Sequence, residues 1–344
     1  MLSAPKIFSS LLNNLPPRPR EVVSGRFGLE KAGSEGETLA AIGERLGVTR
    51  ERVRQVEKFA LDNLGKQITA NAACSQILNR SKQYIKNAGG VIKKDSFLEY
   101  VADFISGLNE KHVALLIEAS GAFCLYPEDK DFWTFYYLSD GHLKRATNFI
   151  EGWANFLDSH KPKVLEGSYH KHLKNFIKSQ GVNKNYAKNY LGISKKIHVN
   201  SYGDVGLRYW PEIKPMTARD RIFLVLKKKG EPLHFEDITG EINKAKLSAE
   251  LALAPTIHNE LIKDERFVLV GRGIYALKEH GYEPGTAREV IHRILKSEGP
   301  LKLDDVVAHV KKQRFFKPNT IVINLQNKNF FERLADGRYK IREV

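Results

Sequence analysis

Apolar residues recur at helical spacing in two neighbouring stretches near the start of the chain. They are Leu39, Ile42 and Leu46 in the first stretch, and Val53, Val56, Ala60 and Leu64 in the second. This spacing predicts two helices that each turn one apolar side inward. Thr38 and Thr49 can cap the starts of these helices, and Gly47 can end the first in the left-handed conformation. The three-residue turn between the helices is typical of a helix-turn-helix.

The other side of the second predicted helix is polar and charged. It carries Arg50, Glu51, Arg54, Gln55 and Lys58. An arginine can bond to O6 and N7 of guanine, a glutamine to N6 and N7 of adenine, and a glutamate can accept from N4 of cytosine. Such a face suits the major groove of DNA, whereas the alternative is a charged face that meets only solvent. The capped turn and the Arg–Gln pair favour the DNA-reading helix.

Helices followed by a β-hairpin recur along the rest of the chain. The run Pro215–Asp220 returns as Pro284–Glu289, an offset of 69 residues, and a helical pattern follows each run. The predicted hairpins pair 123–126 with 132–138, 197–200 with 205–210, 267–270 with 274–277, and 329–334 with 338–341. Three helices and a hairpin in about 65–70 residues are the plan of a winged helix, repeated here in tandem.

These patterns divide the chain into five segments. We expect a helix-turn-helix in 1–70 and winged-helix units in 71–140, 141–215, 216–281 and 282–344. The expected fold class is mainly α with small β-hairpins (α+β). In this fold an N-terminal helix-turn-helix domain of three or four helices precedes tandem winged-helix domains.

The net charge points to a polyanionic partner. The 344 residues include 55 Lys and Arg against 40 Asp and Glu, a formal charge of +15. For a chain without a run of about 18 apolar residues, DNA is a better partner than a membrane. The first residues lack the pattern of a signal peptide. Cys74 and Cys124 have no partner at metal spacing, which fits a reducing cytoplasm.

The charge excess gathers in the middle of the chain. Residues 141–215 hold 13 basic against 5 acidic residues. A predicted helix there places Lys184 and Lys188 one turn apart, with Asn185 and Asn189 beside them. Lysine can neutralise phosphates and asparagine can pair with adenine, so this helix is a second candidate for DNA contact. The alternative is a solvated lysine face over a tyrosine core.

The N-terminal residues resemble a known family. Thr38–Gly43 and Val48–Glu57 closely resemble region 4 of the primary sigma factors of bacterial RNA polymerase. Leu15–Val23 with Arg26–Leu29 resembles the helix that precedes them there, so the resemblance covers roughly residues 12–66. In that family the second helix reads the minus-35 promoter element, and the domain docks on the polymerase β flap. The family's promoter-melting domain lies before region 4, so we expect this chain not to start transcription alone.

The resemblance implies which residues touch DNA. Arg50, Glu51, Arg54 and Gln55 would contact bases and phosphates, and Arg52 would lie at the flank, facing the DNA backbone or the polymerase. The full set that we predict to contact DNA is Thr38, Thr49, Arg50, Glu51, Arg52, Arg54, Gln55, Lys58, Lys184, Asn185, Lys188 and Asn189.

A second resemblance covers residues 217–279. Leu226–Ile238, Pro255–Ile257 and Arg266–Leu277 resemble the HARE-type helix-turn-helix, a winged-helix module of the RNA polymerase delta subunit. Relatives of this module bind either DNA or proteins. The resemblance therefore implies the fold of this segment and leaves its ligand open.

Enzyme signatures are missing from the sequence. It has no GxxxxGK[ST] phosphate loop and no GxSxG elbow. His170 and His172 are two residues apart on a predicted helix and point to different sides, so they cannot form a metal pair. We expect no enzyme activity, no cofactor and no metal.

Three functions remain open at this point. The first is a cytoplasmic, nucleoid-associated bacterial transcription factor that binds double-stranded DNA. The second is an accessory protein that docks on RNA polymerase through the sigma-like N-terminal segment, and the third is the DNA-recognition component of a defence or nucleoid system. Because the sequence has no zipper, a monomer is favoured over an oligomer.

Overall fold

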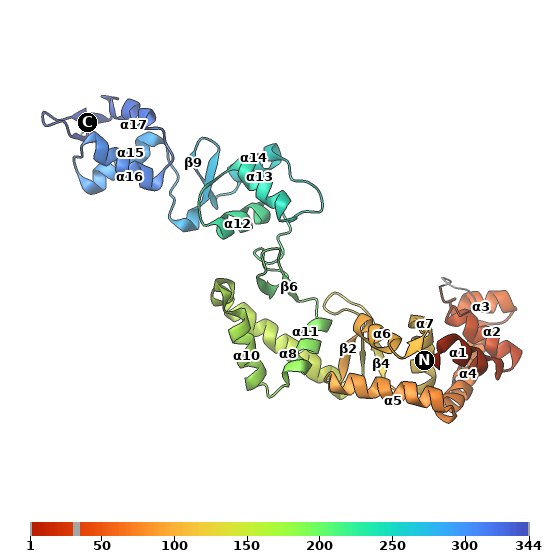
Figure 1. The fold of residues 1–344 in the computed structure, drawn as a ribbon. Helices are drawn as coiled ribbons and strands as arrows, with labels where there is room; N and C mark the ends of the chain where they lie inside the picture. The colour runs from red at the N-terminus through yellow and green to blue at the C-terminus, as the bar shows by residue number, and fades with distance from the viewer. Residues whose placement is uncertain (1, 30–34, 343–344) are drawn as a thin grey trace. The chain divides into compact units, whose positions relative to one another are not determined.

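Helices make up most of the chain, and short β-hairpins follow them (Figure 1). This computed structural model describes residues 2–29 and 35–342. The contacts group the chain into two units, Met1–Ile197 and His198–Val344. The predicted fold class, mainly α with small β-hairpins, is confirmed. Within the described residues, no helix combines the length and the apolarity needed to cross a membrane.

Four helices open the first unit. They are α1 (Ala4–Asn13), α2 (Pro17–Arg26), α3 (Leu39–Leu46) and α4 (Arg50–Ala70). The helices α3 and α4 begin where predicted, because Thr38 and Thr49 each accept a hydrogen bond from a backbone N–H of the first turn. Val22, Ile42 and Val53 are buried together where α2, α3 and α4 meet. We call residues 2–29 and 35–58 the head.

A small sheet follows within the same unit. The elements are α5 (Ala72–Asn87), β2 (Val91–Lys93), α6 (Lys94–Ala102), β3 (Ile105–Ser106), α7 (Glu110–Ser120), β4 (Cys124–Tyr126) and β5 (Phe135–Tyr137). The hairpin predicted here is confirmed as β4 and β5. The apolar pattern did not reveal β2, which adds a third antiparallel strand on the other side of β5. The strand β1 (Leu2–Ser3) pairs with β3 in parallel.

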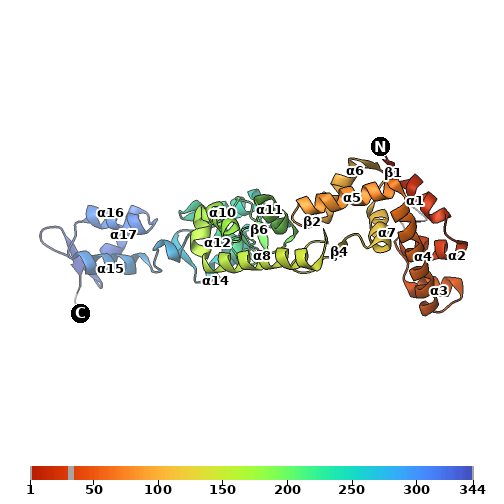
Figure 2. The same cartoon turned by 90° about the horizontal axis from the view of Figure 1, so that it is seen from below.

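The second half of α4 belongs to a core that the head shares with the next segment. Phe8 of α1, Leu64 and Ile68 of α4 and Leu116 of α7 are buried in one apolar cluster. Figure 2 shows α4 beside α1, α5 and α7. A Cβ atom on Gly65 would lie 2.5 Å from the carbonyl oxygen of Ala119, so glycine lets α4 and α7 cross closely. The helix α4 is therefore anchored by residues outside the head.

Further helices complete the first unit, and a hairpin follows them. The elements from there to the next hairpin are α8 (Asp140–Ser159), α9 (Lys161–Lys163), the π-helical turn η1 (Val164–Ser168), α10 (Tyr169–Ser179), α11 (Lys184–Ile193), β6 (Ile197–Val199) and β7 (Val205–Leu207). Phe149, Ala187 and Tyr190 are buried where α8 meets α11. The strands β6 and β7 pair as predicted.

The second unit contains the sequence repeat. Its elements are α12 (Ala218–Lys229), β8 (Leu233–His234), α13 (Phe235–Lys244), α14 (Ala254–Lys263), β9 (Phe267–Gly271), β10 (Ile274–Leu277), the short 3-10 helix η2 (Lys278–His280), α15 (Ala287–Glu298), α16 (Leu303–Gln313), α17 (Pro318–Leu325), β11 (Phe331–Arg333) and β12 (Tyr339–Ile341). Both predicted hairpins form. The repeated run is a capping box in each copy, Thr217 with Asp220 and Thr286 with Glu289.

Backbone contacts join the two copies of the repeat. The N–H of Phe315 donates to the carbonyl oxygen of Val270 at 2.8 Å, beside the edge of β9. The guanidinium of Arg314 is 2% exposed and donates to the carbonyl oxygen of Leu269 at 2.9 Å. Desolvation lowers the pKa of Arg314, and the positive charge of Arg293 lowers it further. The five-segment division and the name winged helix stay predictions.

Candidate nucleic-acid interface

The turn between α3 and α4 is tight and fully bonded. Gly47 adopts the left-handed conformation with φ 63° and ψ 35°. The N–H of Val48 then reaches back to the carbonyl oxygen of Gly43 at 2.9 Å, which closes the last turn of α3. A Cβ atom on Gly43 would lie 2.7 Å from the carbonyl oxygen of Val48, so this glycine is needed for the close approach. The turn therefore fixes the angle at which α4 leaves α3.

The polar face of α4 is exposed, as the sequence predicted. The six predicted residues of this helix that lie open to solvent are Arg50, Glu51, Arg52, Arg54, Gln55 and Lys58. Val53 lies on the other side and is 1% exposed. We call these six residues the reading face. Its side chains are free to meet a ligand, whereas the Thr38 and Thr49 hydroxyls are used as helix caps.

Side chains of the reading face bond to one another in the protein without DNA. Arg54 donates from Nε and Nη2 to the two oxygens of Glu51, at 2.9 and 2.7 Å. This fork lowers the pKa of Glu51 and raises the pKa of Arg54. Nη1 of Arg52 donates to Oε1 of Gln55 at 3.1 Å. Both pairs are exposed, and exposed pairs contribute little to stability, so a ligand can displace them readily.

Ion pairs behind the reading face link α2, α3 and α4. Arg45 of α3 pairs with Glu21 of α2 and with Glu37 before α3. Arg26 at the end of α2 pairs with Glu57 of α4 at 3.2 Å. The sequence pattern does not single out these residues. It shows opposite charges in neighbouring predicted helices, but it does not show which of them pair.

On α11 the structure brings three of the four predicted residues to the surface. Lys184, Asn185 and Lys188 are exposed, whereas Asn189 is half-buried. The Nδ2 of Asn189 donates to the carbonyl oxygens of Ala88 at 3.1 Å and of Asn185 at 3.0 Å. Asn189 thus holds α11 against the turn before β2. Its contact with DNA stays a prediction, and the structure gives it a packing role beside that.

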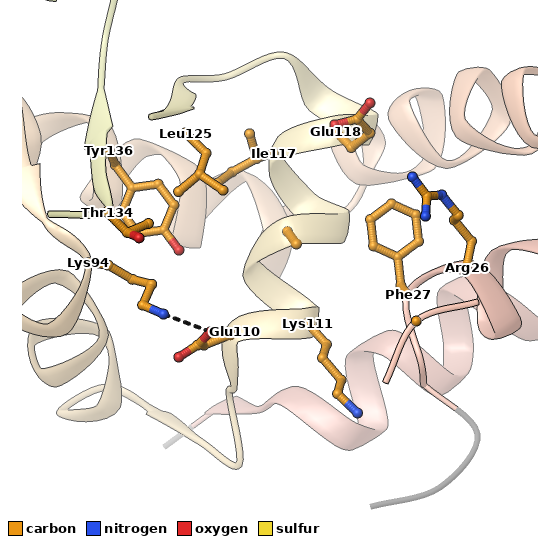
Figure 3. A pocket seen from close by; sticks show the side chains of 12 residues that line it. Arg26, Phe27, Lys94, Glu110, Lys111, Ile117, Glu118, Leu125, Thr134 and Tyr136 are labelled. Carbon is orange, nitrogen blue, oxygen red and sulfur yellow. Dashed lines mark hydrogen bonds and ion pairs between the residues drawn. The ribbon is translucent and has the colours of Figure 1, made fainter. Parts of the chain in front are cut away.

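A cavity of about 360 Å³ lies between the end of α2, α7 and the sheet. Figure 3 shows Phe27 and Arg26 on one side of it and Leu125 on the other, with the Lys94–Glu110 ion pair at its edge. Its basic side chains bond to groups of the chain itself, so we assign the cavity no DNA contact. In the part of the chain that the structure describes, no three His, Cys, Asp or Glu side chains gather as metal ligands.

The similarity to known proteins covers the N-terminal helices of the chain. The model of the family "Sigma-70, region 4" matches residues 11–66. Residues 11–66 are thus similar to region 4 of sigma-70 factors. This match confirms the resemblance seen in the sequence over roughly 12–66. It ends four residues before the last residue of α4, so the region 4 includes the whole reading face and part of the helix that packs against α7.

Several sigma factors carry a similar segment. The chain is 54% identical over 52 residues to the RNA polymerase sigma-B factor of Nostoc sp., which is 15% of this chain and 15% of that protein. It is 50% identical over 56 residues to the sigma factor SigA4 of Synechococcus elongatus, 16% of this chain and 17% of the relative. It is 51% identical over 53 residues to the sigma factor RpoS of Coxiella burnetii, 15% and 14%. The chain thus spans less than a fifth of the length of these relatives.

Removing the cap of α4 is expected to weaken the helix-turn-helix. In Thr49→Ala the N–H of Arg52 loses its side-chain acceptor, and we expect the free energy of unfolding to fall by about 1 kcal/mol. Thr49→Ser keeps the hydroxyl and serves as the control. Urea unfolding followed by circular dichroism measures the difference. If the two variants unfold at the same urea concentration, the cap does not stabilise α4.

Proposed function

We propose that this protein is a DNA-binding transcription factor whose sigma-70 region 4 reads a promoter-like duplex. The observation that carries the proposal is the reading face on α4. Its exposed arginine, glutamine and glutamate have complementary groups on guanine, adenine and cytosine. The helix that presents them is held by a bonded turn on one side and by the shared core on the other.

DNA would enter by exchanging contacts on the reading face. Arg54 exchanges the carboxylate of Glu51 for O6 and N7 of a guanine, which also fit its two parallel donors. Glu51 is then free to accept from a cytosine amino group. Gln55 likewise gives up its hydrogen bond with Arg52 and bonds to an adenine, and the freed Arg52 contacts a phosphate. Arg50 and Lys58 add phosphate contacts at the two ends of the face.

The later segments would add affinity rather than sequence choice. We propose that winged-helix modules in this part of the chain contact the DNA backbone or RNA polymerase. In α12, Lys227, Lys228 and Lys229 pair with carboxylates of the chain, so a phosphate would have to displace these pairs. These pairs disfavour DNA contact by the segment 216–281.

A second candidate function is docking on RNA polymerase. The relatives of residues 11–66 are named as RNA polymerase sigma factors, and that observation favours a polymerase partner. In this alternative the head binds polymerase, and the basic segments only lie near the DNA. The two functions differ in whether the reading face selects bases.

Selection from randomised duplex DNA tests the proposal. The purified full chain is compared with the double variant Arg54→Ala/Gln55→Ala. We expect one motif to be enriched by the natural protein and lost in the variant. If both proteins bind DNA and neither enriches a motif, base reading by α4 is wrong. Capture of purified RNA polymerase by the same two proteins then tests the second function.

A further inference from the structure

The turn between α10 and α11 repeats the geometry of the turn between α3 and α4. Gly181 has φ 60° where Gly47 has φ 63°. A valine follows each glycine, and its N–H reaches back to the preceding helix, from Val182 to Ile177 at 3.2 Å and from Val48 to Gly43 at 2.9 Å. These two exposed glycines belong to different helix pairs of the same unit, so the likeness is one of local structure.

The likeness continues into the second helix of each pair. Asn183 caps α11 with its side chain, as Thr49 caps α4. Four residues after each cap comes a buried residue, Ala187 at 0% exposure and Val53 at 1%. Counted from the cap, Lys184 and Lys188 of α11 then stand where Arg50 and Arg54 stand on α4. A helix-turn-helix presents this side of its second helix to the major groove.

The charges of the two helix pairs differ. Residues 169–193 contain five lysines and no aspartate or glutamate. All five are exposed, and none makes an ion pair within the described residues: Lys171, Lys174, Lys178, Lys184 and Lys188. On the reading face, in contrast, Arg54 is forked by Glu51. Free lysines without neighbouring carboxylates favour a phosphate backbone, and they do not select bases.

We propose that α10 and α11 form a second helix-turn-helix that binds duplex DNA through its backbone, whatever the sequence. Lys184 and Lys188 of α11 contact phosphates at the edge of the groove. Lys178 lies in the last turn of α10, just before the turn that leads to α11. Of the two asparagines of this helix that were predicted to contact DNA, Asn189 is hydrogen-bonded to Ala88 within the protein, and Asn185 is exposed. The first unit therefore carries one helix-turn-helix that reads and one that holds. This second site does not require that α4 reads bases.

Salt dependence of binding to a random-sequence 30-base-pair duplex tests this site in the full chain. The variant is Lys184→Ala/Lys188→Ala. The control is Lys82→Ala/Lys86→Ala, which removes two exposed lysines at the same spacing from α5. The slope of log K against log salt is negative, and each lost phosphate contact makes it less steep by about 0.9. Between 50 and 200 mM salt, the natural protein should then lose about tenfold more affinity than the α11 variant.

Three outcomes decide the proposal. The proposal is supported if the slope is less steep in the α11 variant and unchanged in the control. Lys184→Arg/Lys188→Arg, which keeps both charges, should then have the slope of the natural protein. It is overturned if the α11 variant and the control have the same slope. It is also overturned if the α11 variant loses affinity only for a selected motif, because the helix then reads bases. Thermal unfolding of each variant checks that these exposed substitutions leave the fold intact. Loss of the motif in Arg54→Ala/Gln55→Ala concerns α4 alone, so the two proposals fail separately.

Discussion

Arg54→Ala is expected to remove the preference for one base pair of the target site. The two donors of Arg54 match O6 and N7 of guanine, and losing such a contact reduces discrimination against the wrong base by about 5- to 150-fold. The salt slope should fall by only about 1, because one charge is lost. Titration of the selected duplex and of its single-base-pair variants measures both quantities.

Arg54→Lys separates the charge of Arg54 from its geometry. Lysine keeps the positive charge and loses the planar fork, so we expect it to bind as tightly to random DNA as the natural protein while discriminating as poorly as alanine. If Arg54→Lys discriminates like the natural protein, Arg54 contacts a phosphate. That result would move base reading to Gln55 and Glu51 and would leave the rest of the reading face unchanged.

Leu64→Ala is expected to destabilise the head and the following segment together. Leu64 is 0% exposed in the core that α1, α4, α5 and α7 share. Truncating a buried leucine to alanine costs about 2–5 kcal/mol, since it removes contacts and leaves a cavity. Hydrogen exchange should therefore speed up in α1 and α7 as well as in α4.

The control for Leu64→Ala is Leu125→Ala, at a leucine that is 44% exposed on β4. We expect the control to change exchange only near its own strand. Should Leu64→Ala speed up exchange in α4 alone, the head would fold independently of the segment behind it. The orientation of the reading face would then be set by the head's own small core of Val22, Ile42 and Val53.

The segment similar to sigma-70 region 4 ends inside α4, and the same helix continues into a core that it shares with α5 and α7. The matched residues end at 66, and the helix continues to Ala70 before Asn71 caps α5. Lys111 of α7 also donates to the carbonyl oxygen of Gly28 at 2.9 Å, at the end of α2. The helix that carries the reading face therefore shares a buried core with α5 and α7.

Local signals in the sequence were enough to predict several features. The caps Thr38 and Thr49, the left-handed Gly47 and the exposed stripe of α4 all follow from residues within one or two turns of each other. The four hairpins were found in the same way, because side-chain periodicity and turn residues leave a pattern in the sequence. The repeated run was also visible there, and the structure shows that it forms a capping box in each copy.

Tertiary structure alone decided the features that depend on distant partners. The strand β2 pairs with β5, although α6, β3, α7 and β4 lie between them in the sequence. Asn189 bonds to Ala88, 101 residues away. Gly65 meets Ala119 only because α4 and α7 cross there. Periodicity shows which side of an element is apolar, and it does not show which other element covers that side. The sequence by itself thus predicted α4 and its exposed polar face, and the packing of α4 against α7 decided what holds that helix in place.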